Sequence, residues 1–357
     1  MEIGIVGLPN VGKSTLFNAL TGAGAAVANF PFTTIEPNVG VVPLADERLQ
    51  RLAEKFDSAK ITPAGIRFVD IAGLVKGASQ GEGLGNKFLS HIRSVDAVAQ
   101  VIRLFQDENV VYVLQDLNPL QAVDIIETEL LLADLEQCRK AVEKFKGSAS
   151  SGDKKAKETM TFLEAAVEGF NQGKSARLLN FPSEFFAQFQ FLTAKPLLYV
   201  ANTDEEKVPE PLLEPLRKRA QQEKAGLVVL SAKMEAEIVQ LPEDERPAYY
   251  EAAGISSPGL ARLAQAGKEL LNLVCFFTAG PKEARAWLIP RGTKAQQAAG
   301  KIHTDIERGF IRGEVYQYDD LMRLGSYKAV QEKGLVSLEG KDYEIQEGDI
   351  VYFRFSV

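Results

Sequence analysis

Short apolar runs alternate with amphipathic stretches along much of the chain. The first run holds Ile3, Ile5 and Val6 and predicts a buried strand, with a helical pattern beginning at Ser14. Further strand-like runs follow at 38–43, 66–71, 97–105, 196–201 and 227–230. Strands that alternate with helices form βαβ units, so the pattern predicts an α/β fold with a mainly parallel sheet covered on both faces. A ligand is then expected at the carboxyl ends of the strands.

A different pattern occupies residues 124–194. Apolar residues follow 4-3-4-3 spacing in two stretches on either side of a Gly/Ser-rich segment at 147–153: Leu131, Leu135, Cys138, Val142 and Phe145, then Ala156, Met160, Leu163, Val167 and Phe170. Two such seams joined by a turn predict an inserted antiparallel helical hairpin, a coiled-coil arm that projects from the sheet domain. Two ordinary helices packed on the core are the alternative.

The turn of this arm is predicted to be basic. Between residues 139 and 157 there are seven basic residues and two acidic ones, a local net charge of +5: Arg139, Lys140, Lys144, Lys146, Lys154, Lys155 and Lys157 against Glu143 and Asp153. A basic knob suits contact with a large polyanion such as RNA. A run of charges is also typical of a merely solvated surface.

The pattern changes again after residue 280. Strand-like runs at 286–289, 313–318 and 350–355 predict a small mixed-sheet domain. Part of it is basic, with seven Lys or Arg residues against three acidic ones at 282–312. We therefore predict a sheet domain of residues 1–123 and 195–278, an inserted arm at 124–194 and a third domain at 279–357.

Composition narrows the class of protein. The chain has 357 residues, 45% of them hydrophobic and 25% charged, which is ordinary for a globular protein. No run is long and apolar enough to predict a membrane span, and no signal peptide is predicted. Its two cysteines, Cys138 and Cys275, suggest neither a disulfide framework nor a zinc site, so we expect a cytoplasmic protein. A net charge of −7 restricts any RNA contact to local patches.

The strongest candidate chemistry lies directly after the first strand. Residues 7–14, GLPNVGKS, match G-x-x-x-x-G-K-[ST], the loop that wraps the phosphates of a nucleoside triphosphate. In that geometry backbone N–H groups and the helix dipole attract anions. Lys13 is predicted to reach the β- and γ-phosphates and Ser14 to coordinate Mg²⁺. The candidate nucleotide-binding residues of this loop are Asn10, Val11, Gly12, Lys13, Ser14 and Thr15.

Shorter motifs complete the candidate site. Asp70 ends a predicted strand, where it can hold Mg²⁺ through water, and the N–H of Gly73 can sense the γ-phosphate. In the segment at 29–34, Thr34 is favoured over Thr33 as a metal ligand. Catalytic roles are assigned to Lys13, Thr34, Asp70 and Gly73. Two segments that each follow a strand are expected to frame the base: Asn202, Thr203 and Glu205, and Ser231, Ala232 and Lys233.

The residues of these motifs resemble those of the YchF (Obg-like ATPase) branch of the translation-factor-related GTPases. The resemblance runs from end to end and covers these segments: 7–15, 29–34, 70–78, 83–86, 299–305 and 309–311. It implies a P-loop domain, a coiled-coil arm and a C-terminal TGS domain of ubiquitin-like β-grasp fold. It also implies association with the ribosome, through its large subunit, the whole particle or its RNA, and regulation of translation or stress responses.

The base-reading segment departs from ordinary GTPases. Guanine readers use Asn-Lys-x-Asp, whereas this chain has glutamate, Glu205, at the fourth position. The extra methylene displaces the carboxylate, and losing a charge-assisted hydrogen bond to guanine costs about 1.5–3 kcal/mol. The resemblance implies ATP, with Asn202 and the backbone at Thr203 contacting adenine. A guanine contact by Glu205 from a shifted backbone is the alternative.

The positions expected to orient the attacking water also depart from the usual pattern. Leu74 stands where many switch GTPases have the glutamine that orients water. Gln100 stands where the family usually has a histidine, and a glutamine can orient water but cannot accept its proton. Asn10 matches the asparagine that helps potassium-dependent relatives bind K⁺. We therefore expect slow, Mg²⁺-dependent hydrolysis with K⁺ as a candidate activator.

The resulting hypothesis is a monomeric, ATP-hydrolysing switch that associates with ribosomes, with protein clients as further candidate partners. Two alternatives remain open. In one, the chain is a nucleotide-gated binding module in which hydrolysis is incidental. In the other, it is a conventional GTPase.

Overall fold

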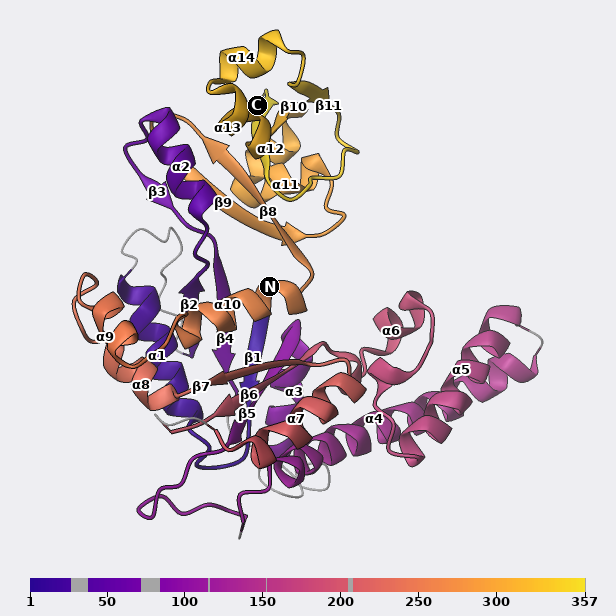
Figure 1. Ribbon diagram of the computed structural model, residues 1–357. Helices are drawn as coiled ribbons and strands as arrows, with labels where there is room; N and C mark the ends of the chain where they lie inside the picture. The colour runs from indigo at the N-terminus through magenta and orange to yellow at the C-terminus, as the bar shows by residue number, and fades with distance from the viewer. Residues whose placement is uncertain (27–37, 72–83, 115, 152, 205–207, 357) are drawn as a thin grey trace. The chain divides into compact units, whose positions relative to one another are not determined.

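The computed structural model describes residues 1–26, 38–71, 84–114, 116–151, 153–204 and 208–356 (Figure 1). The chain divides into two compact units. The first is formed mainly by Met1–Ala23 and Arg67–Ala266, and the second mainly by Val41–Ile66 and Gly267–Val357. The described part holds no helix that is both long and apolar enough to cross a membrane.

The first unit is built on a sheet whose six described strands follow the order β2-β4-β1-β5-β6-β7. Their bounds are β1 Glu2–Val6, β2 Val39–Pro43, β4 Gly65–Asp70, β5 Ala97–Arg103, β6 Leu197–Asn202 and β7 Gly226–Leu230. The pairs β1–β4, β1–β5, β5–β6 and β6–β7 are all parallel, which confirms the predicted sheet. Every residue of β5 and β6 is buried, as expected for central strands that are covered on both faces.

Helices of the first unit connect these strands. Their bounds are α1 Lys13–Ala26, α3 Leu84–Ser94, α7 Glu210–Gln222, α8 Ala232–Ile238, α9 Arg246–Ala252 and α10 Gly259–Leu270. The helix α1 follows β1 after a short loop, and α8 follows β7 directly. Both helices therefore begin at the carboxyl edge of the sheet, where the site is expected.

The inserted arm is the predicted helical hairpin. It consists of α4 (Pro119–Ser150) and α5 (Lys154–Asn171), which pack against each other (Figure 1). The side chain of Asn118 caps α4 by accepting hydrogen bonds from the N–H groups of Leu120 and Gln121. The predicted turn is shorter than expected, because residues 147–150 continue α4 as helix. Gly147 is exposed in this last turn, and the hydroxyl of Ser150 donates a hydrogen bond to the carbonyl oxygen of Lys146 there.

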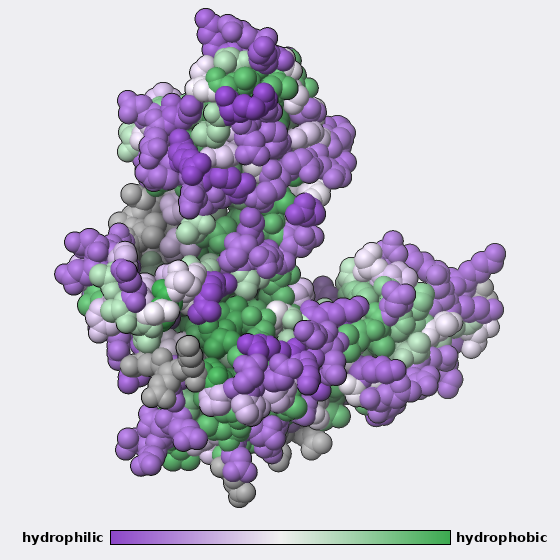
Figure 2. Space-filling view, viewed as in Figure 1, coloured by the Kyte–Doolittle hydropathy of each residue, from purple (hydrophilic) through white to green (hydrophobic). Residues whose placement is uncertain are grey.

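Half of the seam residues predicted for the arm are buried and half are partly buried, and a third layer packs against them. Leu135, Cys138, Leu163 and Phe170 lie in one hydrophobic cluster with residues from the segment that returns to the sheet. That segment contains η1 (Ala176–Leu178), α6 (Ser183–Phe189) and η2 (Leu192–Ala194). Its aromatic side chains complete the cluster: Phe185, Phe189 and Phe191. The seven basic residues at 139–157, on α4 and α5, are all exposed, and Figure 2 shows hydrophilic residues toward the turn of the arm.

The second unit is the predicted mixed-sheet domain. Its six described strands follow the order β11-β10-β12-β8-β9-β3. Their bounds are β3 Ile61–Thr62, β8 Leu273–Ala279, β9 Ala284–Pro290, β10 Phe310–Gln317, β11 Ser337–Glu339 and β12 Asp349–Phe355. The pairs β12–β8 and β3–β9 are parallel, whereas β8–β9, β10–β11 and β10–β12 are antiparallel. Five helices among the described residues belong to this unit: α2 Glu47–Phe56, α11 Ala295–Ile302, α12 Thr304–Arg308, α13 Tyr318–Leu324 and α14 Tyr327–Glu332.

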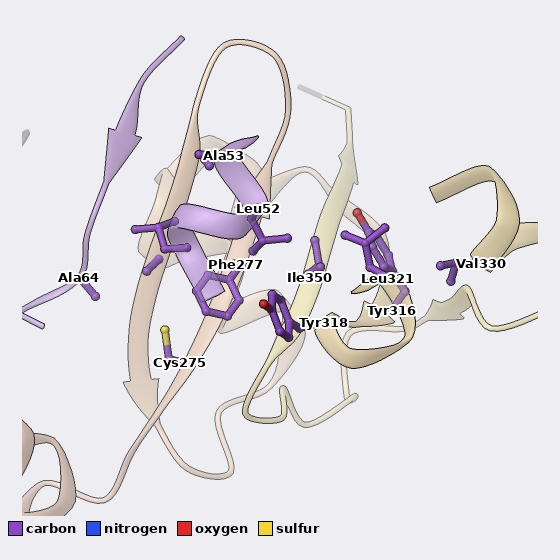
Figure 3. Close-up of a cluster of buried hydrophobic side chains, with 13 residues drawn as sticks. Leu52, Ala53, Ala64, Cys275, Phe277, Tyr316, Tyr318, Leu321, Val330 and Ile350 are labelled. Carbon is purple, nitrogen blue, oxygen red and sulfur yellow. The ribbon is translucent and has the colours of Figure 1, made fainter. Parts of the chain in front are cut away.

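The division into units differs from the predicted domain boundaries. The prediction placed residues 1–123 together, yet α2 and β3 belong to the second unit, as does β8, which was placed before the boundary at 279. The physical reason is packing: Leu52 of α2 is fully buried in one cluster with Phe277 and Ile350 (Figure 3). A second cluster, which includes Phe276, Trp287 and Ala298, contains side chains of α11.

Candidate functional site

The loop between β1 and α1 has the backbone geometry that its motif predicts. Asn10 and Gly12 both adopt positive φ angles, 61° and 91°. A Cβ atom on Gly12 would lie 2.2 Å from Nδ2 of Asn202, so both backbone and space require glycine there. Val11 is only 1% exposed and lies beneath the loop surface, where its carbonyl oxygen accepts a 2.9 Å hydrogen bond from Asn202. The buried side chain of Asn202 therefore holds the backbone of the loop in place.

Lys13 is held by the loop itself. Its Nζ donates hydrogen bonds to the carbonyl oxygens of Gly7 (2.9 Å) and Leu8 (2.7 Å). Burial lowers the pKa of Lys13, and the nearby negative charge of Asp70 opposes this change. An ammonium group in this position offers a positive charge next to backbone donors, the arrangement that binds phosphate.

Asp70 is the last residue of β4, as predicted, and it faces the same region. Burial raises the pKa of its carboxyl group, and the positive charge of Lys13 lowers it. Ser14 and Thr15 follow Lys13 in the first turn of α1. Among the residues that the structure describes, no group of three or more His, Cys, Asp or Glu side chains could hold a metal. Ser14 and Asp70 carry oxygen atoms, the kind of ligand that Mg²⁺ prefers, and Mg²⁺ takes few protein ligands when phosphates supply the rest.

A cavity of about 740 Å³ lies at this edge of the sheet. It brings together ten predicted nucleotide-binding residues: Asn10, Gly12, Lys13, Ser14, Thr15, Asn202, Thr203, Ser231, Ala232 and Lys233. Five further residues line the cavity: Asp204, which lies in the segment expected to frame the base, and Phe105, Gln106, Asp107 and Val110, which were not predicted. Four of these follow β5, a predicted strand, and the rule that ligands bind at the carboxyl ends of parallel strands could have found them.

Asn202 joins two loops of the cavity. It is 3% exposed, and its Oδ1 accepts a 2.9 Å hydrogen bond from the N–H of Ala232 while its Nδ2 donates to Val11. Both polar atoms of the side chain are thus used by the protein backbone. Ser231 caps α8 by accepting from the N–H of Met234, which fixes the direction in which that helix leaves the cavity.

Six predicted site positions do not line the cavity or are not described. Val11 is buried beneath the loop, and Asp70 at the end of β4 is not among the lining residues. Thr34, Gly73 and Glu205 lie outside the described residues. Gln100 is 2% exposed, and its Nε2 donates a 3.1 Å hydrogen bond to the carbonyl oxygen of Ala122 in α4. Gln100 is not among the described residues that line the cavity. This position does not support a water-orienting role for Gln100, because its amide connects the sheet to α4 instead.

Comparisons with known proteins agree with this geometry. Residues 2–133 match a family model described as a 50S ribosome-binding GTPase, and residues 273–356 match YchF-GTPase_C, described as a protein of unknown function (DUF933). The proteins called "Ribosome-binding ATPase YchF" of Bacillus subtilis and Pasteurella multocida are each 47% identical to this chain, with 100% of this chain aligned to 100% and 99% of theirs. A solved YchF GTPase structure from Schizosaccharomyces pombe has a TM-score of 0.88 and 35% identity, covering 99% of this chain and 97% of that one.

Proposed function

The chain belongs to the YchF family, and from this membership we propose that it is an ATPase that binds Mg·ATP in the cavity beside β1 and acts as a ribosome-associated switch. One observation carries the proposal: the phosphate loop and the two loops expected to frame a base line the same cavity. The relatives are named ribosome-binding ATPases, which agrees with both parts of the proposal.

The phosphate end of the cavity is assigned to residues of the first unit. Lys13 and the N–H groups of the loop bind the phosphate oxygens, and Lys13 neutralises charge that develops during hydrolysis. Ser14 and, through water, Asp70 would hold Mg²⁺, which would supply polarisation of the phosphoryl group. We assign the second metal-coordinating hydroxyl to Thr34 and the γ-phosphate contact to Gly73.

The base end is assigned to adenine. Phe105 and Val110 supply apolar surface to the cavity, which suits a purine ring. The backbone at Thr203 and the loop at 231–233 are assigned to the remaining sides of the base site. Glu205, in place of the aspartate of guanine readers, disfavours guanine. Asn202 acts here mainly by holding these loops together.

Hydrolysis by the isolated chain is proposed to be slow. Leu74 cannot orient water, and Gln100 is bonded to α4. Asn10 uses Nδ2 to donate to the carbonyl oxygen of Val111, so its Oδ1 is the atom we assign to K⁺. The position of Gln100 also favours a second candidate, a nucleotide-gated binding module in which hydrolysis is incidental.

The exposed basic turn of the arm is proposed to contact ribosomal RNA. Seven exposed basic side chains on α4 and α5, on either side of the turn, provide a local field that attracts phosphates despite the acidic net charge. We further propose a monomeric, cytoplasmic protein that regulates translation or stress responses, with protein clients as additional partners.

Calorimetry with Mg²⁺ present tests the nucleotide proposal. Mg·ATP is expected to bind more tightly than Mg·GTP, and Lys13→Ala to abolish ATP binding and hydrolysis, whereas the exposed Lys218→Ala should change neither. Equal or tighter GTP binding would make the chain a conventional GTPase. Single-turnover ATPase rates are then measured in KCl and NaCl, each with and without ribosomes. Ribosomes should raise the ATPase rate of a switch but not that of a binding module. Equal rates in the two salts would reject the K⁺ role.

A further inference from the structure

We infer that Arg103 is a positioning residue of the nucleotide site, holding the loop after β5 as the wall beside the base; this inference rests on the proposed function. Arg103 ends β5 and is 4% exposed. The following stretch, 104–118, has neither helix nor strand in its described residues. Fixing such a segment costs conformational entropy, so other contacts must hold its shape.

The Arg103 guanidinium provides contacts along that segment. Its Nε donates to the carbonyl oxygen of Phe105 (3.1 Å), Nη1 to that of Val110 (3.1 Å) and Nη2 to that of Asp107 (3.3 Å). A planar group with donors on several sides can bind three carbonyl oxygens that a single amine would not reach together. One side chain therefore sets the curvature of this loop.

Two aromatic rings of the same loop lie against the guanidinium. Its central carbon is 4.3 Å from the ring centroid of Phe105 and 5.0 Å from that of Tyr112. Both distances are in the range of cation–π contacts, which are stronger when the cation is removed from water. The ring of Phe105 is thus held in orientation as well as in place.

The loop is also joined to the other two sides of the cavity. Arg103 Nη1 donates to the carbonyl oxygen of Asn10 (3.2 Å), and Asn10 Nδ2 donates back to that of Val111 (2.8 Å). The N–H of Gln106 donates to the Asp204 carboxylate (3.3 Å), which lies in the segment expected to frame the base. Arg103 thus connects the phosphate loop with the wall of the base site.

The wall is the part of the cavity that depends on Arg103 most. Phe105, Asp107 and Val110 all line the cavity, and all three backbone carbonyls bind the guanidinium. Lys13 is held independently by Gly7 and Leu8. Loss of Arg103 should therefore weaken recognition of the base far more than recognition of the phosphates.

Calorimetry of Arg103→Gln with Mg·ATP, Mg·GTP and tripolyphosphate tests this inference. ATP binding is expected to weaken at least about tenfold, as for lost hydrogen bonds to a charged group, and the ratio of ATP to GTP affinity should approach one. Tripolyphosphate affinity should change by less than about twofold. Amide hydrogen exchange at 104–113 should become faster. The ATP affinity of Arg103→Lys should lie between those of the wild type and Arg103→Gln, because an ammonium group keeps the charge but lacks the planar set of donors.

Two further variants keep the test decisive. Arg217→Gln removes an exposed arginine and should match the wild type. Phe105→Ala retains Arg103 and should lose ATP affinity while protection at 104–113 remains, which tests the wall even if Arg103→Gln does not fold. Unchanged ATP affinity and exchange in Arg103→Gln would overturn the inference, as would an equal loss for tripolyphosphate. If the wild type binds neither nucleotide, the proposed function fails, whereas exchange at 104–113 still reports on positioning.

Discussion

The side chain of Asn202 donates a 2.9 Å hydrogen bond to the carbonyl oxygen of Val11, a residue 191 positions earlier in the chain. Asn202 also accepts a hydrogen bond from the N–H of Ala232. All three residues are at most 3% exposed, so water cannot replace these contacts. The phosphate loop and the start of α8 are therefore held at a fixed separation by one buried amide.

Asn202→Ala is expected to destabilise the protein and to weaken ATP binding. The substitution leaves a buried carbonyl and a buried N–H without partners, at about 1–3 kcal/mol each. Urea unfolding followed by circular dichroism, together with calorimetry of Mg·ATP, measures both effects. Asn180→Ala, at an exposed position, is the control. Wild-type stability and affinity in Asn202→Ala would show that the two loops are held by other contacts.

Gly12→Ala is expected to abolish nucleotide binding. Its Cβ would lie 2.2 Å from Nδ2 of Asn202, which cannot move without breaking the bond to Val11. Gly173→Ala is a matched control, because Gly173 also has positive φ (75°) but nothing lies within 4 Å of the added carbon. The control should show only backbone strain, on the order of 1 kcal/mol. Retained ATP binding in Gly12→Ala, measured by calorimetry, would contradict this account of the loop.

The root of the arm should become less stable as pH rises. Asp134 of α4 is fully buried and accepts hydrogen bonds from Leu192 and Thr193 of the returning segment. Burial raises the pKa of Asp134 from 3.8 to about 6, against the opposing effect of these bonds. The folded state thus holds the proton at higher pH than the unfolded state. The stability contributed by Asp134 is largest below pH 3.8 and is lost as pH rises through about 6.

Asp134→Asn removes this titration. Between pH 4 and 7 the free energy of unfolding of the wild type should fall relative to that of Asp134→Asn by about 2–3 kcal/mol. Urea unfolding at pH 4, 5, 6 and 7 measures the difference, and Glu136→Gln on the same helix controls for loss of one carboxylate. A difference that stays constant over this range would refute the assignment to Asp134.

Residues 41–66 are expected to be required for the second unit to fold. Leu52 of α2 is fully buried among residues of β8, β12 and α13, so Leu52→Ala should destabilise that unit by about 2–5 kcal/mol. Trp287 is the only tryptophan of the chain and lies in this unit, so its fluorescence during urea unfolding reports the change. Arg51→Ala, an exposed neighbour on α2, is the control. An unshifted Trp287 transition in Leu52→Ala would be the contrary result.

The sequence could predict those parts of the site that lie in short motifs at the end of a recognisable strand. The phosphate loop, Asp70 and the two segments after β6 and β7 each follow a strand that hydrophobic pattern reveals. The loop after β5 carries no comparable motif, so Phe105 and Arg103 were not assigned. For Gln100 the sequence was insufficient in another way. Its position in a strand predicts that it is buried, but the contact of its amide with Ala122 depends on how α4 packs.

In the fold, too, features set by nearby residues could be predicted and features set by distant residues could not. Parallel strands and the hairpin seams follow from local periodicity, which nearby residues determine. The placement of α2 and β3 does not, because their buried faces are covered by residues more than two hundred positions later in the chain. Such distant partners leave no local pattern in the sequence.

Because α2 and β3 pack with the last third of the chain, the second unit is not one continuous stretch of sequence. A fragment limited to the C-terminal third would lack two elements that its core packs against. Any shortened chain meant to contain this unit whole must therefore also include the segment between β2 and β4.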